Sequence, residues 1–211
     1  MSHSFFITLE GCEGVGKSTA LSYIKNYLSE KNINFIVTRE PGGTGVAEAL
    51  RKILLHHDDE TILPITELLL IFAARAQHIA HVIKPALEAK QWVISDRFTD
   101  ASFAYQGGGR KMSMDQLHIL SDWVQGDLQP NLTLLFDAPV EIGLSRMTVR
   151  GATDRIEKEK ADFFERVRAV YLARANQFPE RFKIIDATQS FESVQKQIEQ
   201  ALKQITPFEK V

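Results

Sequence analysis

Residues 11–18 of the chain read Gly11-Cys12-Glu13-Gly14-Val15-Gly16-Lys17-Ser18. This stretch has the P-loop pattern of glycine, four residues, glycine, lysine and serine, and it lies between an apolar run at residues 5–9 and an amphipathic stretch at 17–31. A strand, a tight loop and a helix in this order turn backbone N–H groups towards an anion, and the helix adds the positive end of its dipole. We expect Lys17 to reach the β and γ phosphates of a nucleoside triphosphate and Ser18 to bind Mg²⁺.

Four further apolar runs continue an alternation of strands and helices. They lie at residues 34–38, 92–95, 132–136 and 182–185, and helical segments separate them. Such alternation indicates parallel strands whose two faces are covered by helices. The sequence therefore predicts an α/β protein with the three-layer P-loop NTPase fold, in which helices flank a five-stranded parallel sheet, as one domain over residues 1–211.

The composition disfavours several classes of protein. The 211 residues carry a formal net charge of −2, whereas a general nucleic-acid binder needs a basic surface for its phosphate contacts. The apolar runs are too short to cross a membrane, and residues 1–10 lack the features of a secretory signal. Cys12 is the only cysteine, which fits a reducing compartment. We expect a cytoplasmic protein that binds neither nucleic acid nor membranes.

Arginines gather at loops and helix ends beyond the P-loop. Arg39 and Arg97 directly follow apolar runs, at strand ends where open parallel sheets bind ligands. A single arginine is most often a solvated surface residue, but that interpretation explains poorly why two follow buried strands. A guanidinium can also donate two parallel hydrogen bonds to a phosphate. The sequence thus predicts a second anion site, and its candidate residues are Arg39, Arg51, Arg75, Arg97, Arg146, Arg150 and Arg155.

Two aspartates compete for the support of a metal ion. Asp96 and Asp137 each end an apolar strand, as the aspartate of a Walker B motif does. We prefer Asp96 because Arg97 follows it, whereas Asp137 can simply begin the loop before Pro139. Ser18 and Asp96 are therefore the expected Mg²⁺ ligands, with Asp137 as the alternative.

Four more stretches resemble bacterial thymidylate kinases in their order and spacing. They are Thr38-Arg39-Glu40-Pro41-Gly42-Gly43-Thr44, Asp96-Arg97-Phe98, Ala104-Tyr105-Gln106-Gly107-Gly108-Gly109-Arg110 and Asp154-Arg155-Ile156-Glu157. The resemblance covers nearly the whole chain. The resemblance implies an enzyme that phosphorylates dTMP to dTDP with ATP and Mg²⁺, and that forms a homodimer through the apolar helices expected at residues 66–89 and 114–124.

The resemblance also implies roles for single residues in binding dTMP. Arg75 would hydrogen-bond the thymine carbonyl, and Tyr105 would pack against the sugar and leave no room for a 2′-hydroxyl. Phe72 would stack on the base, although many relatives place this phenylalanine where the chain has Ile71. Without the resemblance, Phe72 would be assigned to the core. The other implied dTMP contacts are Arg39, Arg51 and Arg97 at the phosphate, Ser102 and Gln106 at the base, Glu13 near the 3′-hydroxyl or a metal-bound water, and Glu40.

The residues expected to bind ATP are those of the P-loop, Thr19 and Arg146. The acceptor would be a phosphate that is already anionic at neutral pH, so no general base is needed and catalysis depends on positioning and charge neutralisation. Lys17 and Arg97 are expected to contribute to it. Because the P-loop has no arginine between its glycines, a lid at residues 149–158 would supply another cation. Arg150 and Arg155 are both candidates for this catalytic role, and the sequence does not choose between them.

Other interpretations remain open. A kinase for another nucleoside monophosphate, such as dUMP, UMP or CMP, would use the same framework, because a thymine methyl is worth only about 1 to 3 kcal/mol. A nucleotide-binding switch is a non-enzymatic alternative, although no Asn-Lys-x-Asp motif for guanine is present. His78 and His81, three residues apart on an expected helix, are predicted to face solvent or a partner subunit. The sequence does not decide whether the Glu40–Pro41 peptide is cis.

Overall fold

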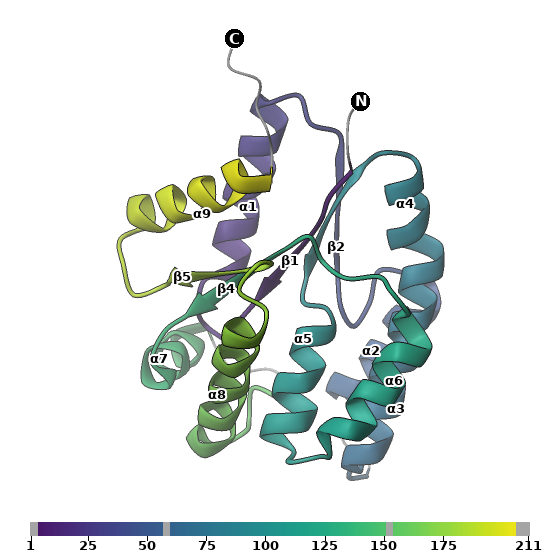
Figure 1. The fold of residues 1–211 in the computed structure, drawn as a ribbon. Coiled ribbons are helices and arrows are strands. Elements are labelled where there is room, and N and C mark those ends of the chain that lie inside the picture. Colours follow the sequence, from purple (N-terminus) through teal and green to yellow (C-terminus); the bar gives the residue numbers. More distant parts are fainter. Residues whose placement is uncertain (1–3, 57–59, 151–153, 206–211) are drawn as a thin grey trace.

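The computed structural model describes residues 4–56, 60–150 and 154–205. Within them, five parallel strands form one sheet in the order β2-β3-β1-β4-β5 (Figure 1). Their bounds are β1 Phe6–Glu10, β2 Phe35–Arg39, β3 Trp92–Asp96, β4 Leu132–Asp137 and β5 Phe182–Asp186. The predicted five-stranded parallel sheet is confirmed, and every strand begins within one residue of its expected start.

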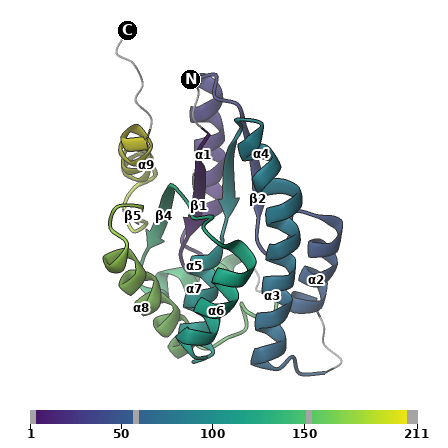
Figure 2. The ribbon, with the colours of Figure 1, turned by 45° about the vertical axis from the view of Figure 1, so that its right-hand side comes forward.

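Helices cover both faces of this sheet. The α-helices are α1 Lys17–Glu30, α2 Gly45–His56, α3 Pro64–His78, α4 Lys84–Glu88, α5 Thr99–Ser102, α6 Met114–Gln125, α7 Val140–Arg150, α8 Ala161–Gln177 and α9 Phe191–Ile205, and two π-helical segments are η1 Ile79–Ile83 and η2 Phe103–Gly109. Helices α1 and α9 pack on one face, while α4, α8 and the helices joined to them pack on the other (Figures 1 and 2). The three-layer arrangement predicted from the alternation is therefore confirmed.

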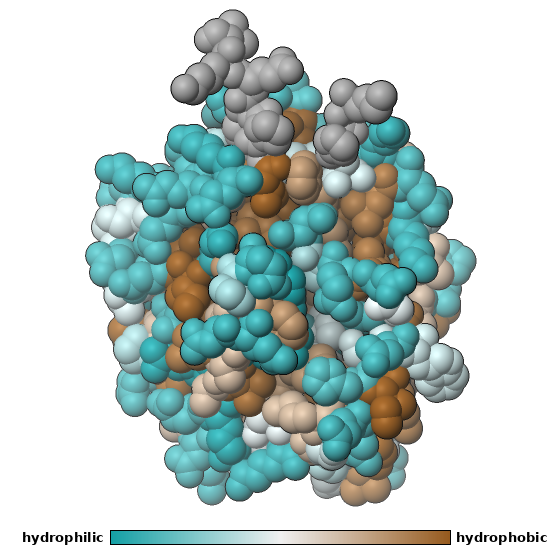
Figure 3. Space-filling model, in the orientation of Figure 1, coloured by the Kyte–Doolittle hydropathy of each residue, from teal (hydrophilic) through white to brown (hydrophobic). Residues whose placement is uncertain are grey.

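The face of the molecule drawn in Figure 3 is mainly polar. Hydrophobic residues show on it in several places, among them the lower right, where Figure 1 places α3 and α6. On these two helices Leu69, Ile119 and Trp123 are exposed, Trp123 to 83%. Among the described residues, no helix has both the length and the apolar character that a membrane crossing requires.

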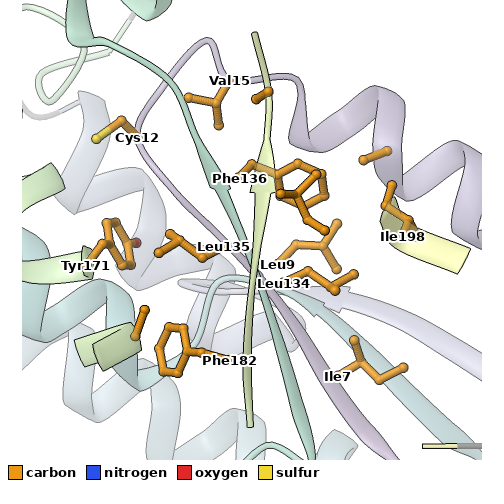
Figure 4. Close-up of a cluster of buried hydrophobic side chains, with 14 of the residues drawn as sticks. Ile7, Leu9, Cys12, Val15, Leu134, Leu135, Phe136, Tyr171, Phe182 and Ile198 are labelled. Carbon is orange, nitrogen blue, oxygen red and sulfur yellow. The ribbon is translucent and has the colours of Figure 1, made fainter. Parts of the chain in front are cut away.

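The core lies on both sides of the central strands, as their continuous apolar runs predict. Along β4 the side chains alternate: Leu134 faces Ile198 of α9, and Leu135 lies on the side of Tyr171 of α8 (Figure 4). All five residues of β1 are buried. A strand with helices on both faces reads as a continuous apolar run, because both of its sides face the core.

The register of the strands places the functional candidates at one edge of the sheet. Leu9 of β1 pairs with Asp96 of β3, which in turn pairs with Arg39 of β2. The P-loop follows β1 at the same level, and Arg97 follows β3. The carboxyl ends of these parallel strands therefore bring the predicted triphosphate and anion sites together.

The π-helical segment η2 contains the glycine run Gly107-Gly108-Gly109, and its packing gives this run a structural role. It packs along α8, and a Cβ atom at Gly108 would lie 2.8 Å from the carbonyl oxygen of Arg166. Glycine is needed there because two backbones meet. This close packing fixes the side chains of Tyr105 and Gln106 on the same segment, and π-helical turns are frequent at functional sites.

Candidate active site

Two adjoining pockets lie at the carboxyl edge of the sheet. The phosphate pocket is formed by residues 13–19 of the P-loop with Arg39, Asp96 and Arg146 among its other walls. The side pocket lies next to it and is lined by Arg75, Ser102 and Gln106, among others. Five residues line both pockets, namely Glu13, Glu40, Arg51, Arg97 and Asp154. The pockets are therefore two parts of one cleft, and the shared residues lie at their junction.

The P-loop has the geometry of a phosphate cradle. Gly14 has a φ of 73°, and a Cβ there would collide with the Gly143 carbonyl of α7, so this position requires glycine. Lys17 is buried and its Nζ donates to the carbonyl oxygens of Gly11, at 3.0 Å, and Cys12, at 2.7 Å. Burial and the nearby Arg97 lower the pKa of Lys17. A bound polyphosphate would offset both effects and favour the ammonium form.

Cys12 departs from the rest of the predicted triphosphate-binding loop. Its side chain is buried in the core, with Sγ 3.8 Å from the Phe164 carbonyl oxygen, and it lines neither of the two pockets. Burial raises the pKa of its thiol to about 11. Gly11 also lies behind the pocket wall, where its carbonyl accepts hydrogen bonds from Lys17 and Arg97. Any contact of Cys12 with a nucleotide would have to use its backbone.

Arg97 joins the two pockets. Its Nη2 donates to Oε1 of Glu13 at 2.6 Å and to the hydroxyl of Tyr105 at 3.0 Å, while Nη1 donates to the Gly11 carbonyl and the hydroxyl of Tyr171. Burial alone would raise the pKa of Glu13, but Arg97 and Lys17 outweigh it and hold this pKa at about 2. Glu13 is therefore an anion that keeps the guanidinium at the junction.

A buried glutamate lies beneath Arg97. Glu10 at the end of β1 accepts hydrogen bonds from the Phe98 amide, at 2.8 Å, and from the hydroxyl of Tyr171, at 2.7 Å. Burial, with the nearby Asp100, raises the pKa of Glu10 to about 8. The carboxyl group is thus largely protonated at neutral pH. The sequence provided no signal for this, because Glu10 lies between the apolar run at residues 5–9 and the P-loop, a position that does not indicate whether its side chain is buried.

The two aspartates that compete for the metal differ in their surroundings. Asp96 lines the phosphate pocket together with Ser18, and its buried Oδ1 has no hydrogen-bond partner among the described residues. Asp137 lies outside both pockets and forms two hydrogen bonds with Arg168, at 2.8 and 2.9 Å. A carboxylate and a hydroxyl are oxygen ligands of the kind that Mg²⁺ prefers when water and phosphate complete its shell. The residues of the phosphate pocket therefore fit Mg²⁺, with Asp96 as the aspartate.

The other predicted cations lie around the phosphate pocket. Arg39 lines it while pairing with both carboxylate oxygens of Glu48, and it remains half exposed. Arg51 lies at the junction and donates to the Pro41 carbonyl oxygen at 2.9 Å. Arg146 reaches from α7 to the Gly14 carbonyl oxygen at 3.4 Å. The structure thus brings Arg39, Arg51 and Arg146 together around the phosphate pocket.

Of the two lid candidates, the structure describes the side chain of Arg155. Arg155 is held at the side pocket, where its Nη2 donates to Oε2 of Glu67 at 2.5 Å and its Nε to the Leu54 carbonyl oxygen, and it does not line the phosphate pocket. In this arrangement Arg155 is not placed to contact a transferred phosphoryl group. Arg150 ends α7, but its side chain and residues 151–153 lie outside the described part of the lid segment 149–158.

The side pocket contains a buried arginine with a free donor. Arg75 is 1% exposed, and its Nε donates to Oε2 of Glu40 at 2.7 Å. Its Nη2 donates to Oγ of Ser102 and to the Phe98 carbonyl oxygen, whereas Nη1 is buried without a hydrogen-bond partner among the described residues. An uncompensated donor of this kind favours a ligand with a carbonyl or another acceptor. Tyr105 and Gln106 line the same pocket, as expected.

Phe72 requires a correction. It is 2% exposed in a hydrophobic cluster with Leu68, Phe103 and Leu117, and it does not line the side pocket. Ile71 occupies the pocket wall instead. The reason is helical geometry, because Ile71 and Arg75 are four residues apart on one face of α3, while Phe72 is turned towards α6 and η2. The Phe72 ring supports the Arg75 guanidinium, whose Cζ lies 4.6 Å from the ring centroid.

His78 also differs from the prediction. It is fully buried, and its ring nitrogens lie 2.9 Å from Oε1 of Glu40 and 2.6 Å from Oγ1 of Thr38, whereas His81 is exposed as expected. Glu40 thus bridges His78 and Arg75, and the Glu40–Pro41 peptide is cis. The sequence held a usable signal, since His78 lies three residues after Arg75 on the same helix face.

Comparison with known proteins gives a consistent result. The family model for thymidylate kinase matches residues 9–198. The thymidylate kinases of Pseudomonas putida strain F1 and Janthinobacterium sp. strain Marseille are 54% and 53% identical, over 93% and 94% of this chain and 94% and 96% of their own lengths. The crystal structure of thymidylate kinase from Ehrlichia chaffeensis matches with a TM-score of 0.77 at 32% identity, covering 95% of this chain and 99% of that one.

Proposed function

The chain belongs to the thymidylate kinase family, and on this premise we propose that it transfers a phosphoryl group from ATP to dTMP with the help of Mg²⁺. ATP would occupy the phosphate pocket with its γ-phosphate towards the junction. The thymidine part of dTMP would occupy the side pocket, with its own phosphate at the junction. The observation that carries this proposal is the shared wall of the two pockets, where Glu13, Arg51 and Arg97 lie.

The proposed reaction is a direct in-line transfer without a general base. The attacking oxygen belongs to a phosphate that is ionised at neutral pH, so no proton has to be removed. The main obstacle is the repulsion between two anionic groups. Lys17 lines the phosphate pocket and Arg97 lies at the junction, and both donate to the Gly11 carbonyl oxygen; together they would neutralise and align the two groups.

The metal would add to this neutralisation. Mg²⁺, when bound, supplies charge compensation and orientation for the β- and γ-phosphate oxygens. Ser18 and Asp96 would hold it, since Asp96 offers an uncompensated buried oxygen in the same pocket. Asp96 also lies next to Arg97 in the chain, so one strand end would position both a metal ligand and a phosphate ligand.

A lid over residues 149–158 remains part of the proposal. Arg155 is tied to Glu67 at the side pocket, so Arg150 at the end of α7 is the better candidate for the cation that contacts the transferred group. Replacing either arginine by alanine tests this assignment. If both single variants kept turnover within about threefold of wild type, the lid would supply no catalytic cation.

A kinase for another pyrimidine monophosphate is the alternative activity. The proposal favours a deoxyribose, because Tyr105 lines the side pocket, where the family resemblance implies that it packs against the sugar and leaves no room for a 2′-hydroxyl. Values of kcat/KM for dTMP, dUMP, UMP, CMP and AMP decide between the activities. The proposal expects dTMP to be the best substrate and dUMP the next, because a methyl group contributes only about 10- to 200-fold. A preference for UMP or CMP would contradict it.

We also propose that the protein is a cytoplasmic homodimer. The support for a dimer is the exposed apolar surface of α3 and α6, where Ile65, Leu69, Ile119 and Trp123 lie on two helices that pack together. A second copy with the same surface would cover it by two-fold symmetry. Sedimentation of the purified protein tests this assembly, and a monomer at micromolar concentration would contradict it.

A further inference from the structure

Glu67 is a buried acid whose position the proposed reaction does not explain. It lies on α3, it is 1% exposed, and it lines the side pocket. Donors from two stretches of the chain converge on its carboxylate: Gln106 of η2 donates from Nε2 at 2.8 Å, Arg110 directly after η2 donates from Nε at 3.3 Å, and Arg155 of the lid segment donates from Nη2 at 2.5 Å. Such a complete set of donors around one side chain fixes its position.

The carboxylate can only accept hydrogen bonds. Burial alone would raise the pKa of Glu67, but Arg110 and the hydrogen bonds from Gln106, Arg110 and Arg155 outweigh it and lower this pKa. An ionised carboxylate has no proton to donate, so the amide of Gln106 has to present its NH₂ group to Glu67. The orientation of the amide follows from this chemistry, whereas a flexible amide could turn either way.

Gln106 is 3% exposed and lines the side pocket, so the oxygen at the other end of its amide is the acceptor that remains for a ligand. Arg75 lines the same pocket and has a buried donor, Nη1, without a partner among the described residues. One fixed acceptor and one fixed donor suit the thymine edge, where N3–H donates and the carbonyl at C4 accepts. Cytosine has the opposite pattern, with N3 as an acceptor and an amino group at C4.

We propose that Glu67 is a positioning residue that sets the base preference of the side pocket, because it holds the Gln106 amide in the orientation that accepts from N3–H. The inference rests on the proposed function and adds a residue that acts on specificity without touching the base. Arg110 and Arg155 keep the carboxylate in place. The pocket would thereby select the 4-oxo pyrimidine edge and reject the 4-amino edge.

The sharpest test compares dTMP with 5-methyl-dCMP, which differ only at this edge of the base. For wild type and Glu67→Gln, kcat/KM is measured with each nucleotide, or the inhibition constant where turnover is too slow. A glutamine at this position can present either an oxygen or an NH₂ group, so the Gln106 amide is free to turn. The expected result is that the preference for dTMP over 5-methyl-dCMP falls by about tenfold or more in Glu67→Gln.

Three further variants separate this role from a merely structural one. Glu67→Asp keeps an acceptor-only carboxylate, so its preference should stay within about threefold of wild type even if both rates fall. Glu159→Gln changes another acid that pairs with Arg110 but not with Gln106, and its preference should also be unchanged. Gln106→Met removes the acceptor while Glu67 stays intact, and it should lose the preference. This last variant keeps the inference falsifiable if Glu67→Gln does not fold, because a wild-type preference in Gln106→Met would overturn it.

The outcomes are distinct. Loss of preference in Glu67→Gln and Gln106→Met, with retention in Glu67→Asp and Glu159→Gln, supports the inference. A wild-type preference in Glu67→Gln or in Gln106→Met overturns it, and so does an equal loss of rate on both nucleotides in Glu67→Gln and Glu67→Asp. A wild-type protein that does not phosphorylate dTMP at all contradicts the proposed function itself, which is seen before any variant is compared.

Discussion

Arg97, which follows the third strand of the chain, donates a hydrogen bond of 2.6 Å to Glu13 inside the P-loop. This contact joins the part of the cleft that would hold ATP to the part that would hold dTMP. The guanidinium of Arg97 is also held through its other terminal nitrogen, Nη1, which donates hydrogen bonds to the Gly11 carbonyl oxygen and the Tyr171 hydroxyl. The position of this guanidinium is therefore set by the folded protein before any nucleotide binds.

Replacing Arg97 by lysine should lower kcat by about 10²- to 10³-fold. Lysine keeps the charge but not the planar fork, whose Nη2 contacts Glu13 while Nη1 contacts the Gly11 carbonyl oxygen, so the junction loses its fixed cation. Steady-state kinetics at saturating nucleotides measures the effect. Arg168→Lys is the matched control, because Arg168 pairs with Asp137 outside both pockets and should retain near-normal turnover.

Replacing Asp96 and replacing Asp137 should have different effects on the Mg²⁺ dependence of turnover. Asp96→Asn should reduce turnover sharply and raise the Mg²⁺ concentration needed for half-maximal rate, because the buried Oδ1 in the phosphate pocket loses its charge. Asp137→Asn should leave the Mg²⁺ dependence unchanged. Titrating Mg²⁺ at fixed ATP and dTMP gives both answers. The reverse pattern would assign the metal to Asp137.

His78 should act on dTMP binding through Glu40 and Arg75. Without the imidazole, Glu40 loses a partner at 2.9 Å and no longer holds Arg75 from a fixed position. We expect His78→Ala to raise KM for dTMP by about tenfold, and KM for ATP by less than about threefold. His78→Asn, which retains a donor towards Glu40, should recover part of the loss. His81→Ala changes an exposed histidine of the same helix and should behave as wild type. Equal rises in both KM values would instead indicate a general loss of structure.

Glu10 should make folding stability depend on pH. Its pKa is raised from 4.5 to about 8 in the folded protein, so the native state keeps a proton that the unfolded chain releases. Stability should therefore fall as the pH rises from about 4.5 to about 8 and then level off. Glu10→Gln imitates the neutral carboxyl and lacks this dependence. The difference in Tm, variant minus wild type, should increase between pH 5 and pH 8.5. The exposed Glu180→Gln is the control and should show a constant difference.

The sheet and the phosphate cradle could be predicted from the sequence because each has a local signal. The strands are short apolar runs, and the P-loop is a contiguous pattern next to one of them. Neither signal depends on residues distant in the chain. The π-helical turns of η1 and η2 were not predicted, since the sequence around them has the ordinary spacing of a helix.

The details of the site depended on contacts between distant segments. Leu68-Leu69-Leu70-Ile71-Phe72-Ala73-Ala74 is apolar on every face, so the run could not tell which side chain meets the pocket. The choice between Asp96 and Asp137 as the metal ligand depended on Arg168, which lies on α8 and pairs with Asp137. Glu67 was overlooked and His78 was wrongly expected to face solvent or a partner subunit, although their spacing from Ile71 and Arg75 follows one face of α3.

One measurement tests the central claim that a single cleft holds ATP and dTMP end to end. The wild-type protein is incubated with ATP and Mg²⁺, with and without dTMP, and ADP and dTDP are quantified over time. The account predicts that dTMP increases ADP formation by about 100-fold or more, and that one dTDP appears for each ADP. ADP formation at the same rate in both samples, without dTDP, would contradict it and favour a nucleotide-hydrolysing switch.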